Sequence, residues 1–193
     1  MAIKAVIFDC FGVLIIGGKK SIQHDFPSHK TELHDLAMRS DYGYITRDEF
    51  NATTTELTGL SAADFEARYW AKNVRNESAF EWVRALTIST DYSIGMLSNI
   101  GRGWLDDLIP EQERDELFTS VVLSGDVGMI KPAPELFALA AQRLGVLPQE
   151  CVMIDDLLDN IDGASRAGMH GIVFDTTAQA QAELDRIVEA QRA

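Results

Sequence analysis

Short apolar runs recur along the chain, and each is followed by a turn and then by a helical pattern. Runs that are apolar on both faces are typical of strands buried in a parallel sheet, and their alternation with helices favours an α/β, doubly wound fold. Such a fold binds ligands at the carboxyl ends of its strands. The predicted strands are IKAVIF (3–8), YSIGML (92–97), SVVL (120–123), CVMI (151–154) and a weaker GIVF (171–174).

A long segment of different character separates the first predicted strand from the second, and it exceeds what a simple crossover requires. Helix-capping patterns occur within it: Thr46 with Glu49, Ser61 with Asp64, and Asn76 before ESAFEWVRAL. The segment therefore predicts an inserted helical module. The predicted parts are a discontinuous core domain at residues 1–15 and 87–193 and a helical cap domain at residues 16–86.

Composition argues against several classes of partner and location. The formal net charge of -13 disfavours a nucleic acid or an anionic membrane, because both bind basic surfaces. No apolar run reaches the roughly 18 residues that a membrane helix needs. Cys10 and Cys151 are too few for a disulfide framework and match no metal-ligand spacing, which favours a cytoplasmic protein. The sequence leaves the oligomeric state open.

Polar residues that can carry chemistry stand at the ends of three predicted strands, and a lysine stands in a loop before the helix that begins at Pro134. Because the carboxyl ends of parallel strands share one edge of a sheet, we expect these groups to converge on one crevice. They are Asp9 after the first strand, Ser98 and Asn99 after the second, Asp155 and Asp156 after the fourth, and Lys131.

The chemistry of these groups points to phosphoryl transfer. Two carboxylates that converge, Asp9 and Asp156, need a cation, and ligation by oxygen alone fits Mg²⁺ best. A carboxylate beside a metal can attack a phosphoryl group and form an aspartyl-phosphate. Ser98 would donate a hydrogen bond to the transferring oxygens, and Lys131 would offset their charge.

Four stretches resemble, in order and position, the motifs of the haloacid dehalogenase (HAD) superfamily of hydrolases. The resemblance is to the phosphatase-like branch, and it implies a Rossmann-like core with a helical type 1 cap inserted after the first motif. A small phosphorylated molecule is the implied substrate. The stretches are IFDCFGVL (7–14), LSN (97–99), IKPAPELF (130–137) and VMIDDLLDNIDGASRAGM (152–169).

The same resemblance implies a role for each residue. Asp9 is the implied nucleophile, and Ser98, Asn99 and Lys131 are the implied ligands of the phosphoryl group. Asp9, the backbone carbonyl of Phe11 and the carboxylate of Asp156 are the implied ligands of Mg²⁺, with Asp155 and Asn160 supporting them.

Phe11 departs from the family pattern, in which phosphatases carry a second Asp that protonates the leaving group. General acid catalysis contributes roughly a hundred- to ten-thousand-fold, so we expect a phosphatase with Phe11 to favour activated leaving groups. Two alternatives stay open. One is a catalytically degenerate HAD-like binding protein, and the other is an enzyme like a 2-haloacid dehalogenase, whose halide leaving group needs no proton.

Four arginines of the predicted cap are candidates for binding a second anionic group of the substrate, and nothing in the sequence ranks them. They are Arg39, Arg47, Arg68 and Arg75.

Overall fold

The computed structural model describes residues 2–17 and 25–192, and its centre is a five-stranded parallel sheet. The strand order β5-β4-β1-β6-β7 places the first strand in the middle of the sheet. All five predicted strands are present, with bounds that differ by one or two residues at some ends. They are β1 (Ala5–Phe8), β4 (Ser93–Ser98), β5 (Ser120–Leu123), β6 (Cys151–Asp155) and β7 (His170–Val173).

Helices cover both faces of this sheet, as the doubly wound fold predicts. Alternate residues of β1 enter different apolar clusters, with Val6 and Phe8 on one face and Ala5 and Ile7 on the other. The first cluster includes side chains of α5 (Glu77–Ser89) and α10 (Thr177–Arg192), and the second those of α8 (Pro134–Arg143) and α9 (Leu158–Arg166). The shorter helices of the core are η2 (Leu105–Asp107), α6 (Glu111–Leu117), α7 (Ser124–Val127) and η3 (Pro148–Glu150).

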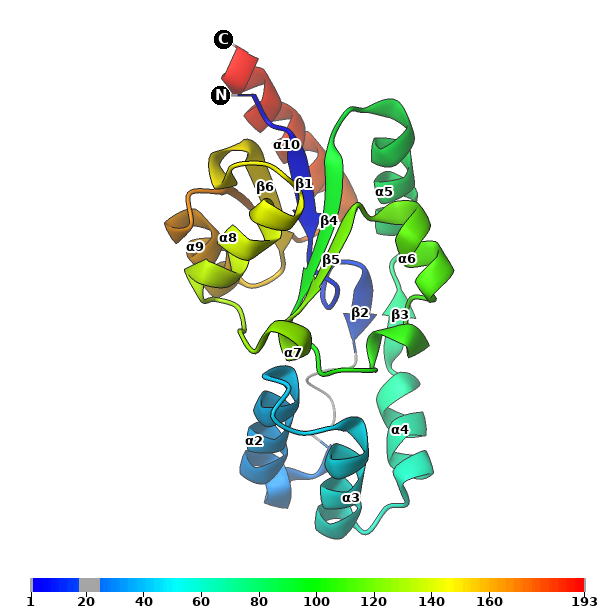
Figure 1. The fold of residues 1–193 in the computed structure, drawn as a ribbon. Coiled ribbons are helices and arrows are strands. Elements are labelled where there is room, and N and C mark those ends of the chain that lie inside the picture. The colour runs from blue at the N-terminus through cyan, green and yellow to red at the C-terminus, as the bar shows by residue number, and fades with distance from the viewer. Residues whose placement is uncertain (1, 18–24, 193) are drawn as a thin grey trace.

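A second group of helices lies beyond the carboxyl ends of the strands (Figure 1). An antiparallel pair of short strands connects this group of helices to the core. Apolar side chains of the helices, such as Leu36 and Phe50, belong to the first core cluster. The elements are β2 (Ile15–Gly17), η1 (Pro27–His29), α2 (Lys30–Asp41), α3 (Arg47–Thr58), α4 (Ala62–Trp70) and β3 (Asn73–Arg75).

Two of the three predicted helix caps are confirmed. Thr46 and Glu49 form a reciprocal capping box at α3, and the Ser61 hydroxyl accepts the Asp64 N–H at α4. The third prediction is wrong in its contact: Asn76 precedes α5, but its side-chain amide donates to the Val13 carbonyl at 2.8 Å instead of capping the helix. Asn76 therefore ties the start of α5 to the loop that follows β1.

The position of α5 bears on where the cap ends. The predicted cap, residues 16–86, includes most of this helix, whereas α5 packs against β4, α6 and α10. We propose that the cap is the segment between β2 and β3 and that the core resumes with α5. Within the described residues, no helix has both the length and the apolar character to cross a membrane.

Candidate active site

Asp9 lies directly after β1, in the middle of the sheet edge where the carboxyl ends of β1, β4 and β6 meet. Its backbone N–H donates to the Ile154 carbonyl at 2.9 Å, which extends the pairing with β6 by one residue. Its side chain is buried, and Oδ1 accepts the Cys10 N–H at 2.6 Å. A buried carboxylate needs compensating partners, so its surroundings decide its charge.

Lys131 supplies the compensating charge. Its Nζ lies 2.8 Å from Oδ1 of Asp9 and 2.6 Å from Oδ2 of Asp155, and the Lys131 side chain is 1% exposed. Burial alone would lower the pKa of Lys131, but the two carboxylates outweigh it and raise that pKa above its ordinary value. Burial raises the pKa of Asp9 to about 7, an effect that Lys131 opposes and Asp155 reinforces.

Asp155 has several hydrogen-bond donors around its two oxygens. Besides Lys131, the amide of Asn160 donates to both oxygens at 2.9 and 3.0 Å, and the Leu157 N–H donates to Oδ1 at 2.9 Å. These bonds fix the Lys131 ammonium and the start of α9 to the end of β6. The geometry fits the supporting role predicted for Asp155 and Asn160.

Asp156 approaches the loop that follows Asp9, at Gly12. A Cβ at Gly12 would overlap the Asp156 carboxyl group, and Gly12 has a φ of +86°, which disfavours any side chain. The Phe11–Gly12 peptide is thereby placed beside this carboxylate. One oxygen from each of Asp9, Asp155 and Asp156 lies within 4.8 Å of the others. Sequence reasoning missed this role of Gly12, although the glycine interrupts an apolar run.

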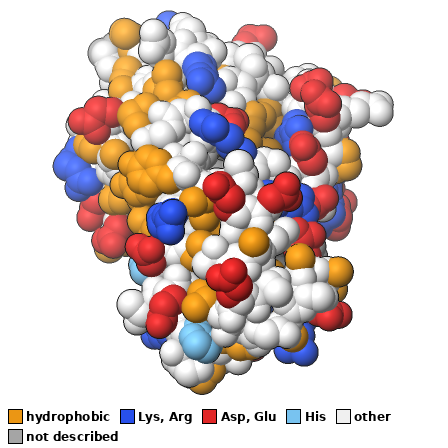
Figure 2. Space-filling model, turned by 60° about the horizontal axis from the view of Figure 1, so that its bottom comes forward, with side chains coloured by type: hydrophobic (Ala, Val, Ile, Leu, Met, Phe, Trp, Pro, Cys, Tyr) orange, Lys and Arg blue, Asp and Glu red, His pale blue; other side chains and the backbone are white. Residues whose placement is uncertain are grey.

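Such a cluster of oxygens fits a hard divalent cation. Three carboxylates lie close together, two of them pair with the Lys131 ammonium, and oxygen ligands at this spacing suit Mg²⁺. The site is separate from the general surface charge: Figure 2 shows acidic and basic side chains interspersed over an exposed face, whereas Asp9, Lys131 and Asp155 are buried.

Ser98 and Asn99 come to the same edge but differ in their contacts. The Ser98 hydroxyl is fully buried at the end of β4 and has no hydrogen-bond partner among the residues that the structure describes. Asn99 instead holds the backbone of Lys131: its amide donates to the Lys131 carbonyl at 3.0 Å, and its oxygen accepts the Lys131 N–H at 2.8 Å. A buried hydroxyl without a partner is uncommon, and this one is suited to donate a hydrogen bond to an oxygen of a bound ligand.

Phe11 occupies the position after Cys10 in this loop and is itself buried, with 8% of its surface exposed. Its side chain belongs to the first core cluster, so it packs as an apolar residue beside the carboxylates. The structure therefore retains the departure seen in the sequence, since a phenyl ring has no proton to donate.

Two of the four candidate arginines are engaged in ion pairs. Arg47 binds Glu66 and Asp107, and Arg75 binds Glu113 and Glu77 and lies over the ring of Phe80. These contacts satisfy both guanidinium groups within the protein, so we do not propose either as a substrate ligand.

Comparison with known proteins places this architecture. A family model described as haloacid dehalogenase-like hydrolase matches residues 3–168. Pyrophosphatase PpaX of Bacillus cereus strain AH820 is 30% identical over 193 residues, covering 96% of this chain and 89% of the relative. The glyceraldehyde 3-phosphate phosphatase of Methanopyrus kandleri is 53% identical over 53 residues, 27% of this chain and 23% of that protein.

Other matches are partial in sequence or concern the fold. The match to YhcW of Bacillus subtilis, 33% identical over 121 residues and 61% of this chain, spans about half of that protein, 53%. The HAD family enzyme BT-2542 of Bacteroides thetaiotaomicron, solved in complex with magnesium and inorganic phosphate, superposes with a TM-score of 0.77 at 23% identity. That superposition covers 91% of this chain and 96% of the enzyme. With the family model covering most of its length, the chain belongs to the haloacid dehalogenase-like hydrolase family.

Proposed function

We propose that this protein is a magnesium-dependent phosphatase-type hydrolase that acts on a small phosphorylated metabolite through an aspartyl-phosphate at Asp9. The observation that carries the proposal is the cluster of Asp9, Asp155 and Asp156 at the carboxyl edge of the sheet, with Lys131 paired to Asp9 and Asp155. The names of the phosphatase and pyrophosphatase relatives, and the magnesium and phosphate bound by BT-2542, support it.

Asp9, Asp156 and the backbone carbonyl of Phe11 would hold Mg²⁺ in this proposal. When bound, the ion would offset the charge of the carboxylates and of the phosphoryl oxygens, so that an anion can approach an anionic site. Asp155 is left to Lys131 and Asn160, because these two residues already donate to both of its oxygens.

Asp9 attacks the phosphorus atom in the first step. Oδ1 already accepts from Cys10 and Lys131, so we assign the attack to Oδ2. The Oδ2–phosphorus bond forms as the bond to the leaving-group oxygen breaks, and that oxygen keeps the electron pair. Water then attacks the phosphorus, which regenerates the Asp9 carboxylate and releases phosphate and a proton.

Ser98 and Lys131 hold the phosphoryl group during both steps. The Ser98 hydroxyl would donate to a phosphoryl oxygen and so gain the partner that it lacks. The Lys131 ammonium carries the charge that the transferring oxygens require, and Asn99 positions it through the Lys131 backbone. Asn99 is thus a positioning residue in this proposal.

Phe11 determines which leaving groups react well. An alkoxide needs a proton as it departs, whereas an acyl or aryl oxide departs as a stable anion. We therefore expect acetyl phosphate and p-nitrophenyl phosphate to be hydrolysed with Mg²⁺, glycerol phosphate to be hydrolysed poorly, and Asp9→Asn to remove all turnover. The matched control is 2-chloropropionate without metal, the substrate of a dehalogenase.

Each result of this panel separates the alternatives. Halide release without Mg²⁺ would replace the proposal with a dehalogenase, and no turnover of any compound would support a binding protein. Replacing Phe11 with Asp supplies the missing acid, so Phe11→Asp should accelerate glycerol phosphate hydrolysis about a hundredfold while changing acetyl phosphate hydrolysis little. Equal acceleration of both substrates would contradict the account of the leaving group.

A further inference from the structure

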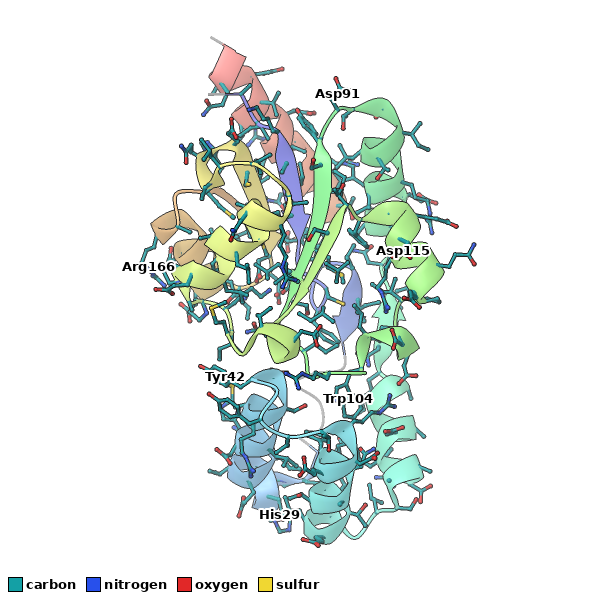
Figure 3. The ribbon with its side chains drawn as sticks, viewed as in Figure 1. His29, Tyr42, Asp91, Trp104, Asp115 and Arg166 are labelled. Atoms are coloured by element: carbon teal, nitrogen blue, oxygen red, sulfur yellow. The ribbon has the colours of Figure 1, made fainter. Side chains whose placement is uncertain are left out.

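The end of α2 and the turn that follows it lie directly on α7 and on the loop after β4, beside the candidate site. Figure 3 shows Tyr42 and Trp104 in the region where the cap helices meet the core. A Cβ at Gly43 would overlap the Gly125 carbonyl, and one at Gly101 would overlap the Ser40 hydroxyl. Glycine at these positions lets the two backbones touch, so the cap is docked closely on the core at this turn.

One buried hydroxyl bridges this contact. Ser124, at the start of α7, is fully buried; its Oγ donates to the Asp41 carbonyl of the cap at 2.6 Å and accepts the Ile100 N–H of the core at 2.9 Å. The Ile100 carbonyl, 3.3 Å away, is a second acceptor for the same proton. A hydroxyl has one proton, so the shorter bond to Asp41 takes it while the cap is docked.

Ile100 leads directly into the candidate site. It follows Ser98, the proposed phosphoryl ligand, and Asn99, whose side chain holds both backbone groups of Lys131. The Ile100 carbonyl also accepts the Gly125 N–H at 3.1 Å. The backbone of Ile100, two residues after Ser98, is therefore held by Ser124 and Gly125, the two residues that the end of α2 and its turn contact.

We infer that Ser124 is a positioning residue that couples the docked cap to the phosphoryl site. Its hydroxyl fixes Ile100, and through Asn99 it fixes Ser98 and Lys131 in the arrangement that phosphoryl transfer needs. This holds while the hydroxyl donates its hydrogen bond to the Asp41 carbonyl of the docked cap. This inference rests on the proposed function for its effect on turnover, but the bridge itself can be tested apart from turnover.

The first test removes the hydroxyl. Ser124→Ala leaves the Ile100 N–H without its acceptor, and we expect kcat for acetyl phosphate to fall about ten- to a hundredfold, because small misplacements cost this much. KM should stay within roughly threefold, since the charges that bind the phosphoryl group are untouched. Mg²⁺ should still raise the thermal midpoint of the Ser124→Ala protein, because the proposed metal ligands Asp9 and Asp156 are retained.

Thr90→Val is the matched control for this loss. The Thr90 hydroxyl also donates to a backbone carbonyl, that of Leu86 at 2.7 Å, and accepts a backbone N–H, that of Tyr92 at 3.3 Å. It lies before β4, at the opposite end of that strand from Ser98. Thr90→Val should keep the wild-type kcat, and equal kcat in the two variants overturns the inference.

The second test moves the cap and leaves Ser124 intact. Gly43→Ala pushes a methyl group against Gly125, whereas Gly59→Ala imposes the same backbone cost, since φ is +71° and +70°, with nothing within 4 Å of the added carbon. Gly43→Ala should lower kcat as Ser124→Ala does, and it should speed hydrogen exchange of the Ile100 amide at least tenfold relative to Gly59→Ala.

Exchange at Ile100 also separates the two proposals. If the wild-type protein hydrolyses none of the phosphate compounds, the proposed function fails, and the exchange rate of Ile100 in Gly43→Ala still decides whether the cap controls this amide. Equal exchange in Gly43→Ala and Gly59→Ala overturns the coupling even if the protein is an active phosphatase.

Discussion

The Lys131 group and the Arg47 group each set one cation between two carboxylates, and they differ in their access to water. Lys131 lies between Asp9 and Asp155, and these three side chains are 1%, 7% and 0% exposed. Arg47 lies between Glu66 and Asp107, with exposures of 27%, 25% and 42%. Both arrangements bring charges within 3 Å, so the contrast is one of solvent.

Desolvation opposes folding at the buried Lys131 group far more than at the Arg47 group. Desolvating ions costs several kcal/mol each, which mutual attraction only partly repays, whereas exposed ion pairs contribute about 0–1 kcal/mol. Arg47 also lies over the Trp104 ring at 4.5 Å and donates to the Gly103 carbonyl at 3.0 Å, so it fastens α3 to the loop after β4. We infer that the buried group serves chemistry and that the partly exposed one, called the exposed group below, serves docking.

The sharpest test of this contrast is Lys131→Met. It leaves two buried carboxylates without their cation, and we expect a loss of about 3–5 kcal/mol in the free energy of unfolding together with loss of turnover. Urea denaturation without Mg²⁺ measures the first effect. Arg47→Met is the matched change at the exposed group and should cost about 1 kcal/mol. Equal losses in the two variants would show that burial does not separate the groups.

The second prediction concerns Mg²⁺ and pH. Because the folded pKa of Asp9, about 7, exceeds its ordinary value of 3.8, this carboxyl favours the folded protein below pH 3.8, and the contribution is lost as pH rises through 7. Mg²⁺ must compete with the proton at Asp9, so its stabilising effect should grow from about pH 5 to about pH 8.

Thermal midpoints measured with and without Mg²⁺ at both pH values provide the measurement. A Mg²⁺ concentration a hundredfold above Kd should stabilise the protein by about 2.7 kcal/mol at the higher pH. Asp156→Asn should remove most of this gain, whereas Asp107→Asn, at the exposed group, should leave it unchanged. A thermal midpoint that Mg²⁺ does not change at either pH value would count against the metal site.

The buried group was largely predictable from the sequence because parallel strands fix where their ends lie. Asp9, Ser98 and Asp155 each end or follow a strand, and the sheet order β4-β1-β6 brings those ends side by side. The carboxylate that pairs with Lys131 was harder to assign. Which of the adjacent residues Asp155 and Asp156 pairs with Lys131 depends on the side to which each points, and the sequence pattern does not set that direction.

The exposed group and the Ser124 bridge could not be predicted, because their partners are distant and no repeat or spacing marks them. Arg47 meets Glu66 at 19 residues and Gly103 at 56 residues along the chain. Ser124 meets Asp41 across 83 residues. Such contacts depend on how the cap sits on the core, and local sequence patterns carry information about single helices and strands only.

The smallest expected effect belongs to Glu66 and tests the exposed group by pH. Hydrogen bonds from Arg47 lower the pKa of Glu66, with a further bond from Asn51 acting in the same direction. A lowered folded pKa stabilises the protein above the ordinary value of 4.5, and this stability is lost as pH falls through the folded value.

Glu66→Gln should therefore lose at most about 1 kcal/mol in the free energy of unfolding at neutral pH, and the difference from wild type should vanish in acid. Urea denaturation of both proteins across that range measures it. A difference that persists unchanged in acid would mean that Glu66 acts through packing, and that the exposed group is not held by charge.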